Sequence, residues 1–166
     1  NLICSRSTAE AISEFGGSPI RTRVGHSYIK AIMAETGAMF GGEHSGHYYF
    51  ARNFGADSGL IAALIVLEQL SQDERPLSEL MAPFDRYASS GEINTAVRDP
   101  ESALRAVANA YDAHSQDFLD GLTVDCGGWW FNLRPSNTEP LVRLNVECSS
   151  EEEVALRVAD ILSLIT

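Results

Sequence analysis

Two patterns of hydrophobic residues occur along the first half of the chain. Apolar residues recur every three or four positions in three stretches, which predicts three helices. A residue that can cap a helix N-terminus precedes each stretch, at Ser7 or Thr8, at Ser27, and at Asp57 or Ser58. Shorter extended runs predict strands at 19–24, 38–40 and 47–50. Short strands that alternate with helices predict an α/β domain with a mixed sheet.

The helix that follows Ser58 is the most apolar element expected in this half. Leucine, isoleucine, valine and alanine fill it from Leu60 to Leu67. A helix that is apolar all round is typical of a protein interior. We therefore expect its large side chains to be mostly buried.

The order of the elements changes after a polar stretch that ends at Pro76. Strands are predicted at 93–97, 122–126, 129–133 and 140–147. One helix opens at Asp99, and another is capped by Ser149 or Ser150, with glutamates in its first turn that suit the helix dipole. This order predicts a small α+β domain, in which two helices cover one face of four largely antiparallel strands. We place the two domains at 1–84 and 85–166.

The net charge limits the classes of binding partner, and the cysteine usage bears on the cellular compartment. The chain has 23 acidic and 12 basic residues, a net charge of −11, which argues against nucleic acid and anionic membrane surfaces as partners. It contains no run of about 18 apolar residues, so no membrane span is expected. Three cysteines without C-x-x-C spacing favour reduced thiols and a cytoplasmic location. The first residues, Asn1-Leu2-Ile3, lack an initiator methionine and a signal peptide, which predicts a fragment of a longer protein.

The glycine-dense loop 41–47 is the first candidate site. Its glycines let the backbone approach a ligand closely. Glu43 and Ser45 are two positions apart, so in an extended loop both side chains point the same way, as suits binding of neighbouring sugar hydroxyls. A plain glycine-rich turn explains the composition equally well. A metal site at Glu43, His44 and His47 is disfavoured, because the intervening glycine prevents both imidazoles from sharing a helical face.

The loop 134–140 is the second candidate site. Arg134 offers a planar fork of donors that matches two phosphate oxygens. Ser136, Asn137 and Thr138 add side-chain donors and, if the loop curls, consecutive backbone N–H groups that form an anion nest. An ordinary polar hairpin turn is equally compatible with these residues.

A third polar cluster contains Arg21, Arg23, His26 and Lys30. His26 precedes the second predicted helix, where it could hydrogen-bond a ligand or transfer a proton near neutral pH. A loop histidine with ordinary hydrogen-bond partners is at least as compatible with the sequence.

Three runs in fixed order carry a resemblance to a known family. They are R-T-R-V-G-H-S-Y-I-K, then G-G-E-H-S-G-H-Y-Y-F, then R-P-S-N-T-E-P. Together they resemble the α-D-phosphohexomutase superfamily over essentially the whole chain. Members have four domains around a cleft, so the resemblance implies that 1–84 is an N-terminally truncated third domain, which binds sugar. It implies that 85–166 is the fourth domain, which binds phosphate.

The resemblance also implies roles for particular residues. Sugar hydroxyls would be bound by Glu43, Ser45 and His47. The substrate phosphate would be bound by Arg134, Ser136, Asn137, Thr138 and, from the third cluster, Arg23. His26 would be the catalytic candidate, as a proton shuttle or a ligand contact. No residue of this chain is assigned to a metal.

The subgroup is indicated by two positions. Phosphoglucosamine mutases typically resemble G-E-Q-S-G-H and R-x-S-G-T-E-P, whereas this chain has His44 and Asn137 there, which favours the phosphomannomutase/phosphoglucomutase group. That group interconverts hexose 1-phosphates and hexose 6-phosphates through a bisphosphorylated intermediate. The alternatives are a phosphoglucosamine mutase and a non-enzymatic sugar-phosphate-binding module.

Family members depend on pieces that this sequence does not contain. They use a phosphoserine in the first domain, Mg²⁺ held by an aspartate-rich loop in the second, and glucose 1,6-bisphosphate or a similar activator. Neither motif occurs here. Without the metal and the phosphoryl donor most of the charge stabilisation is lost. We therefore expect the chain to need the missing N-terminal domains of the same enzyme and to be inactive alone.

Overall fold

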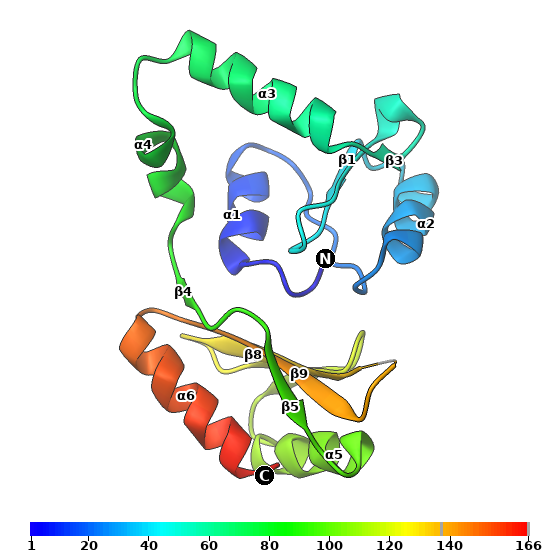
Figure 1. Ribbon diagram of the computed structural model, residues 1–166, viewed down its shortest axis with the longest axis vertical. Coiled ribbons are helices and arrows are strands. Elements are labelled where there is room, and N and C mark those ends of the chain that lie inside the picture. The colour runs from blue at the N-terminus through cyan, green and yellow to red at the C-terminus, as the bar shows by residue number, and fades with distance from the viewer. Residues whose placement is uncertain (137, 166) are drawn as a thin grey trace. The chain divides into compact units, whose positions relative to one another are not determined.

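The computed structural model describes residues 1–136 and 138–165, which form two compact units (Figure 1). The first unit is Asn1–Asp85 and the second is Arg86–Thr166. None of the helices in the described parts of the chain is both long enough and apolar enough to cross a membrane. Each unit is built around its own sheet.

The first unit combines a small sheet with four α-helices. The helices are α1 (Arg6–Glu14), α2 (His26–Thr36), α3 (Gly59–Gln72) and α4 (Leu77–Met81). The strands are β1 (Phe40–Gly42), β2 (Tyr48–Phe50) and β3 (Ala56–Asp57), in the order β1-β2-β3. Two 3-10 turns, Ala51–Asn53 and Ala82–Phe84, complete the unit. Both strand pairings are antiparallel, which differs from the mixed sheet that the sequence predicts.

The close packing of α2 on β1 depends on Gly41. The small core of this unit consists of Ile29, Met33 and Tyr49, of which the first two belong to α2. A Cβ atom on Gly41 would lie 2.8 Å from Ile29 Cγ2 and 2.9 Å from Met33 Sδ. Because such distances are too short for a real Cβ, only glycine lets the helix lie this close to the strand.

The helix ends agree with the sequence at some positions and differ at others. Ser58 caps α3, as the sequence predicts, since its Oγ accepts from the amide of Ile61. Gly37 ends α2 with a φ of 71°. Ser5 caps α1, so the cap expected at Ser7 or Thr8 is wrong by one turn or less. The cap expected at Ser27 is also wrong, because α2 begins at His26 after Gly25, which has a φ of 126°.

The strand expected at 19–24 does not form. A strand needs a neighbour that pairs along its length. This segment accepts one backbone hydrogen bond, from the Leu2 amide to the Thr22 carbonyl at 2.9 Å, and no ladder joins it to another described strand. Alternating composition alone therefore did not identify the pairing.

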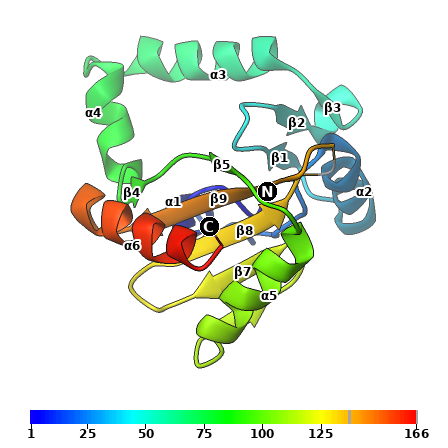
Figure 2. The same cartoon turned by 60° about the horizontal axis from the view of Figure 1, so that its bottom comes forward.

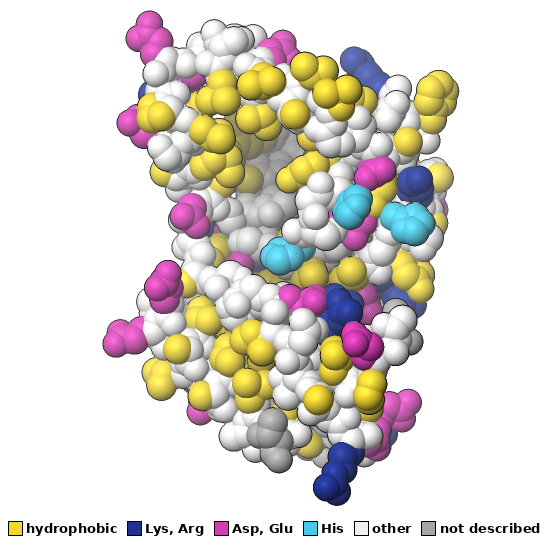
Figure 3. Space-filling model, in the orientation of Figure 1, with side chains coloured by type: hydrophobic (Ala, Val, Ile, Leu, Met, Phe, Trp, Pro, Cys, Tyr) yellow, Lys and Arg dark blue, Asp and Glu magenta, His cyan; other side chains and the backbone are white. Residues whose placement is uncertain are grey.

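The burial expected for α3 is also wrong. None of its residues is buried, and Leu60, Leu64 and Leu67 are 73%, 57% and 59% exposed. Figure 3 shows apolar side chains gathered over this helix. The apolar composition does predict the helix correctly, but most of its large side chains are exposed.

The second unit is an antiparallel sheet with two helices. Its strands are β4 (Ala88–Ser89), β5 (Ile93–Ala96), β6 (Ser115–Asp117), β7 (Leu122–Asp125), β8 (Trp130–Pro135) and β9 (Leu141–Cys148). The order is β4-β9-β8-β7-β6, and β5 also pairs with β9. The sequence predicts β5, β7, β8 and β9 but misses β4 and β6, which are too short to show an apolar alternation.

Both helices of this unit lie on one face of the sheet, as the sequence predicts (Figure 2). They are α5 (Pro100–Ala110), capped by Asp99, and α6 (Glu151–Ser163), capped by Ser150. Val107 of α5 and Ile161 of α6 are fully buried in a cluster with the inward side chains of the strands. This core fixes the ends of β8 and β9, between which the second candidate loop lies.

Candidate functional site

The loop between β1 and β2 is a tight hairpin. The Glu43 amide donates to the His47 carbonyl at 2.9 Å, and the Gly46 amide donates to the Glu43 carbonyl at 2.9 Å. Gly46 has a φ of 83°, in the region that favours glycine. This is the three-residue hairpin loop closed by a left-handed glycine. It corrects the expectation of an extended loop, so the alternation argument for Glu43 and Ser45 does not hold.

Glu43 is oriented from within the unit by a buried tyrosine. The Tyr49 hydroxyl donates to Glu43 Oε1, and Tyr49 is only 1% exposed. Burial, and then the hydrogen bond and negative charge of Glu43, raise the pKa of Tyr49 far above its ordinary value. The tyrosine therefore remains a donor at neutral pH. The second carboxylate oxygen of Glu43 has no partner among the described residues and can accept a further hydrogen bond.

Ser45 and His47 are coupled at the exposed end of the same loop. Ser45 Oγ lies 3.0 Å from His47 Nδ1, and which of them donates depends on the histidine tautomer. The structure thus brings Glu43, Ser45 and His47 together on one hairpin. Within the described residues no group of three His, Cys, Asp or Glu side chains is placed to hold a metal ion.

The third cluster lies at the start of α2. His26 is the first residue of this helix rather than preceding it, and its side chain is exposed. No side chain caps this N-terminus, so its first amides favour an anion. Arg23 stacks on Tyr28, with Cζ 4.5 Å from the ring centroid. Arg23 is therefore held beside the helix N-terminus by a cation–π contact.

The loop between β8 and β9 carries hydroxyl groups that lie close together. Ser136 Oγ and Thr138 Oγ1 are 3.5 Å apart, and the Thr138 amide lies 3.4 Å from Ser136 Oγ. The Ser136 amide donates to the Leu141 carbonyl at 2.9 Å, which extends the pairing of the two strands. This amide is therefore not free for an anion, and the expected nest of consecutive N–H groups is not formed at Ser136. Asn137 lies outside the described residues.

Arg134, at the base of this loop, is held by charged neighbours that the sequence analysis missed. Its Nη2 donates to Glu92 Oε2 at 2.7 Å, and Arg143 Nη1 donates to Glu92 Oε1 at 2.9 Å. The Arg134 side chain is 11% exposed, so its guanidinium is largely enclosed. The sequence carried no signal for this cluster, because Arg134 and Arg143 are brought together only by the register of β8 and β9.

The backbone at Arg134 is fixed by a second missed residue, Gly121. A Cβ atom there would lie 2.5 Å from the Leu133 carbonyl oxygen and 2.6 Å from Arg134 Cα. Its φ of 69° also favours glycine. The buried Asn132 ties this turn to β8, since its Nδ2 donates to the Asp120 carbonyl at 2.9 Å. The Asp-Gly pair was a signal for a turn, although not for its place against Arg134.

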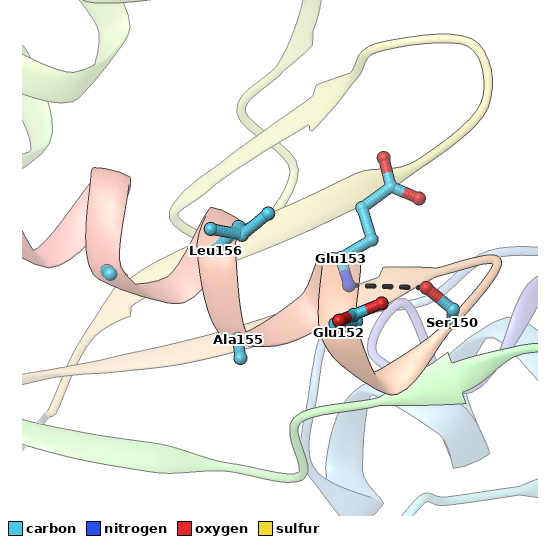
Figure 4. Close-up of a pocket in the computed structure, with 6 residues that line it drawn as sticks. Ser150, Glu152, Glu153, Ala155 and Leu156 are labelled. Atoms are coloured by element: carbon cyan, nitrogen blue, oxygen red, sulfur yellow. Dashed lines mark hydrogen bonds between the residues drawn. The ribbon is translucent and has the colours of Figure 1, made fainter.

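A pocket on α6 is unsuited to a phosphate. It is lined by Ser150, Glu152, Glu153, Ala155, Leu156 and Ala159, and Figure 4 shows the two carboxylates beside the cap of the helix. Acidic side chains repel a phosphate. The basic and hydroxyl groups suited to a phosphate lie at the loop after Arg134 instead.

Comparison with family models identifies the family to which this fold and these two loops belong. A model described as phosphoglucomutase/phosphomannomutase, alpha/beta/alpha domain III, matches residues 1–87. The C-terminal domain of phosphoglucomutase/phosphomannomutase matches residues 92–164. The chain belongs to the phosphoglucomutase/phosphomannomutase family.

Individual relatives agree with this assignment. The chain is 40% identical to a phosphomannomutase of Methanocaldococcus jannaschii over 99% of its own length and 37% of the relative. It is 39% identical to a phosphomannomutase of Escherichia coli over 98% of its own length and 36% of the relative. A phosphoglucomutase/phosphomannomutase family protein of Burkholderia thailandensis superposes with a TM-score of 0.82 at 31% identity, over 98% of this chain and 35% of that one. The chain thus spans little more than a third of these relatives.

Proposed function

We propose that the chain is the substrate-binding C-terminal part of a phosphomannomutase/phosphoglucomutase. The complete enzyme would interconvert hexose 1-phosphate and hexose 6-phosphate through a bisphosphorylated intermediate. The observation that carries the proposal is Arg134, enclosed at the base of a loop whose two hydroxyls lie 3.5 Å apart. The similarity to proteins named phosphomannomutases over nearly the whole chain supports it.

The hairpin of the first unit would bind the sugar ring. The free oxygen of Glu43 accepts from a sugar hydroxyl, while Tyr49 holds the other oxygen. Ser45 and His47 are exposed and both can donate or accept. The intermediate must bind in two orientations, and acceptors on a rigid hairpin can receive equivalent hydroxyls in either one.

The loop of the second unit would bind the phosphate that is not being transferred. Arg134 supplies the charge, Ser136 and Thr138 supply hydroxyl donors, and Asn137 is assigned here from the sequence alone. A hydrogen bond to a charged group contributes about 1.5–3 kcal/mol net. A few such bonds offset the unfavourable field of a chain whose net charge is −11.

The start of α2 would face the ligand with His26 and Arg23. His26 is exposed, and its imidazole suits a hydrogen bond to the ligand or transfer of a proton. Arg23 would add a positive charge beside the helix N-terminus. These two roles rest on the sequence resemblance together with their places in the fold.

The reaction itself would require groups outside this chain. The described residues do not fit a Mg²⁺ site, because they hold no cluster of three suitable ligands. By the resemblance to the family, the metal, the phosphoserine and the response to glucose 1,6-bisphosphate would belong with the other domains of the enzyme. The reduced thiols that the cysteine spacing predicts would suit a cytoplasmic location.

The phosphate-binding role is tested in a full-length enzyme that carries this segment. Arg134→Ala should raise the KM for mannose 6-phosphate about 10- to 100-fold, because a charge-assisted hydrogen bond is lost. An unchanged KM would remove the role. Arg105→Ala, on the exposed face of α5, is the control for loss of one positive charge. Rates on glucosamine 6-phosphate and mannose 6-phosphate separate this function from that of a phosphoglucosamine mutase.

A further inference from the structure

Two arginines face each other directly across the pairing of β8 and β9. Arg134 and Arg143 are register partners, and like charges at such positions repel. Glu92 lies between them and uses a different oxygen for each, at 2.7 Å to Arg134 Nη2 and 2.9 Å to Arg143 Nη1. One carboxylate thus joins both guanidinium groups, and the trio keeps one positive charge.

The trio is partly enclosed, which strengthens the bridge. The side chains of Arg134, Glu92 and Arg143 are 11%, 24% and 30% exposed. Attraction between charges is greater here than at an open surface, because less water screens it. The Nε–H groups of both arginines are buried without an acceptor among the described residues. Since an unpaired buried donor is unfavourable, other contacts must hold the two guanidinium groups in this arrangement.

The backbone and the guanidinium group of Arg134 are fixed by different neighbours. Gly121 lies against the Arg134 backbone, so it fixes the position of Cα. Glu92 holds the guanidinium, at the far end of a flexible side chain. Without Glu92 the guanidinium group of Arg134 would be free to rotate and would be repelled by that of Arg143.

We propose that Glu92 is a positioning residue for phosphate binding, which acts by bridging Arg134 and Arg143 so that the Arg134 guanidinium keeps a fixed direction. The inference rests on the proposed phosphate-binding role of the loop after Arg134. Glu92 does not contact the phosphate in this account. An acidic residue in a phosphate site thus has a favourable function although its own charge repels the ligand.

The direction in which one substitution changes phosphate affinity separates a positioning role from an effect of charge alone. Glu92→Gln removes a negative charge close to the phosphate, so Coulomb's law alone predicts tighter phosphate binding. Positioning predicts weaker binding, because the amide has a single acceptor oxygen and its NH₂ group opposes one guanidinium. Glu92→Asp keeps the charge but is one methylene shorter, so it cannot span both arginines in the same way.

The experiment is a titration of the chain with inorganic phosphate, followed by NMR at the amides of Ser136 and Thr138. Glu92→Gln should raise the Kd for phosphate about tenfold, which corresponds to the loss of about one well-oriented hydrogen bond. Glu92→Asp should raise it by about threefold or more on the same grounds. Glu101→Gln is the matched control, since it removes an exposed glutamate charge from α5 of the same unit, and it should leave the Kd unchanged. Thermal unfolding is recorded in parallel, because a purely structural role lowers Tm without changing the Kd of the folded chain.

The outcomes separate this inference from the proposed function. Phosphate binding by Glu92→Gln that is as tight as, or tighter than, that of the wild type overturns the positioning role. If Glu92→Gln does not fold, an unchanged Kd in Glu92→Asp overturns it instead. If the wild-type chain shows no phosphate-dependent shift at Ser136 and Thr138, the proposed function fails and the role of Glu92 fails with it.

Discussion

A methyl group added at Gly41 should loosen the first unit. The new Cβ would lie 2.8 Å from Ile29 Cγ2 and 2.9 Å from Met33 Sδ, so α2 must move away from β1 or both side chains must leave their rotamers. Overpacking of this kind costs about 1–3 kcal/mol. Since the same strand carries the hairpin of Glu43, we also expect the sugar affinity to fall.

Gly42→Ala is the matched control for this substitution. Gly42 is the next residue of β1, and a Cβ there meets nothing closer than Phe40 at 3.7 Å. It should therefore change stability by less than about 1 kcal/mol in either direction. Native-state hydrogen exchange at the amides of α2 reports the opening free energy of both variants. Equal free energies in Gly41→Ala and Gly42→Ala would refute the packing argument.

Three further substitutions test the burial and the electrostatics of the structure. Because burial and Glu43 raise the pKa of Tyr49, only the unfolded chain releases that proton above about pH 10. The wild type should therefore lose stability as the pH rises beyond that value, and Tyr49→Phe should remove this part of the loss in urea unfolding; an identical slope in both proteins would contradict it. Leu64→Ala on α3 should cost less than about 1 kcal/mol, whereas Ile161→Ala on α6 should cost about 2–5 kcal/mol, because these residues are 57% and 0% exposed. Chemical denaturation of the two variants checks this, and similar losses would mean that α3 is packed like a core helix.

Local signals made much of the fold predictable. Caps at Ser58, Asp99 and Ser150 depend on residues within one turn, and the structure confirms all three. In the long strands β8 and β9 apolar residues alternate with polar ones at 131–134 and 142–148, which made both strands predictable. By contrast, the strand expected at 19–24 fails because pairing depends on a distant neighbour that composition does not specify.

The candidate site, like the fold, was predictable from the sequence only in part. Its two loops are continuous motifs, so their residues could be named from the sequence. The groups that hold Arg134 could not, because Glu92 is 42 residues away along the chain and meets it only through the sheet register. Tyr49 was missed as the partner of Glu43 because an apolar run does not show which side chain turns inward. Motifs therefore identified the residues expected to meet the ligand, while the residues that orient them required the structure.

The central claim, that the hairpin of the first unit binds sugar hydroxyls and the loop of the second unit binds phosphate, is tested most directly by NMR titration of the chain with mannose 1-phosphate. We predict weak, saturable shifts at the amides of Glu43–His47 and at those of Arg134, Ser136 and Thr138, and no formation of mannose 6-phosphate. The absence of a shift at either loop would contradict the binding role proposed for that loop. Formation of mannose 6-phosphate by this chain alone would contradict the assignment of phosphoryl transfer to the other domains.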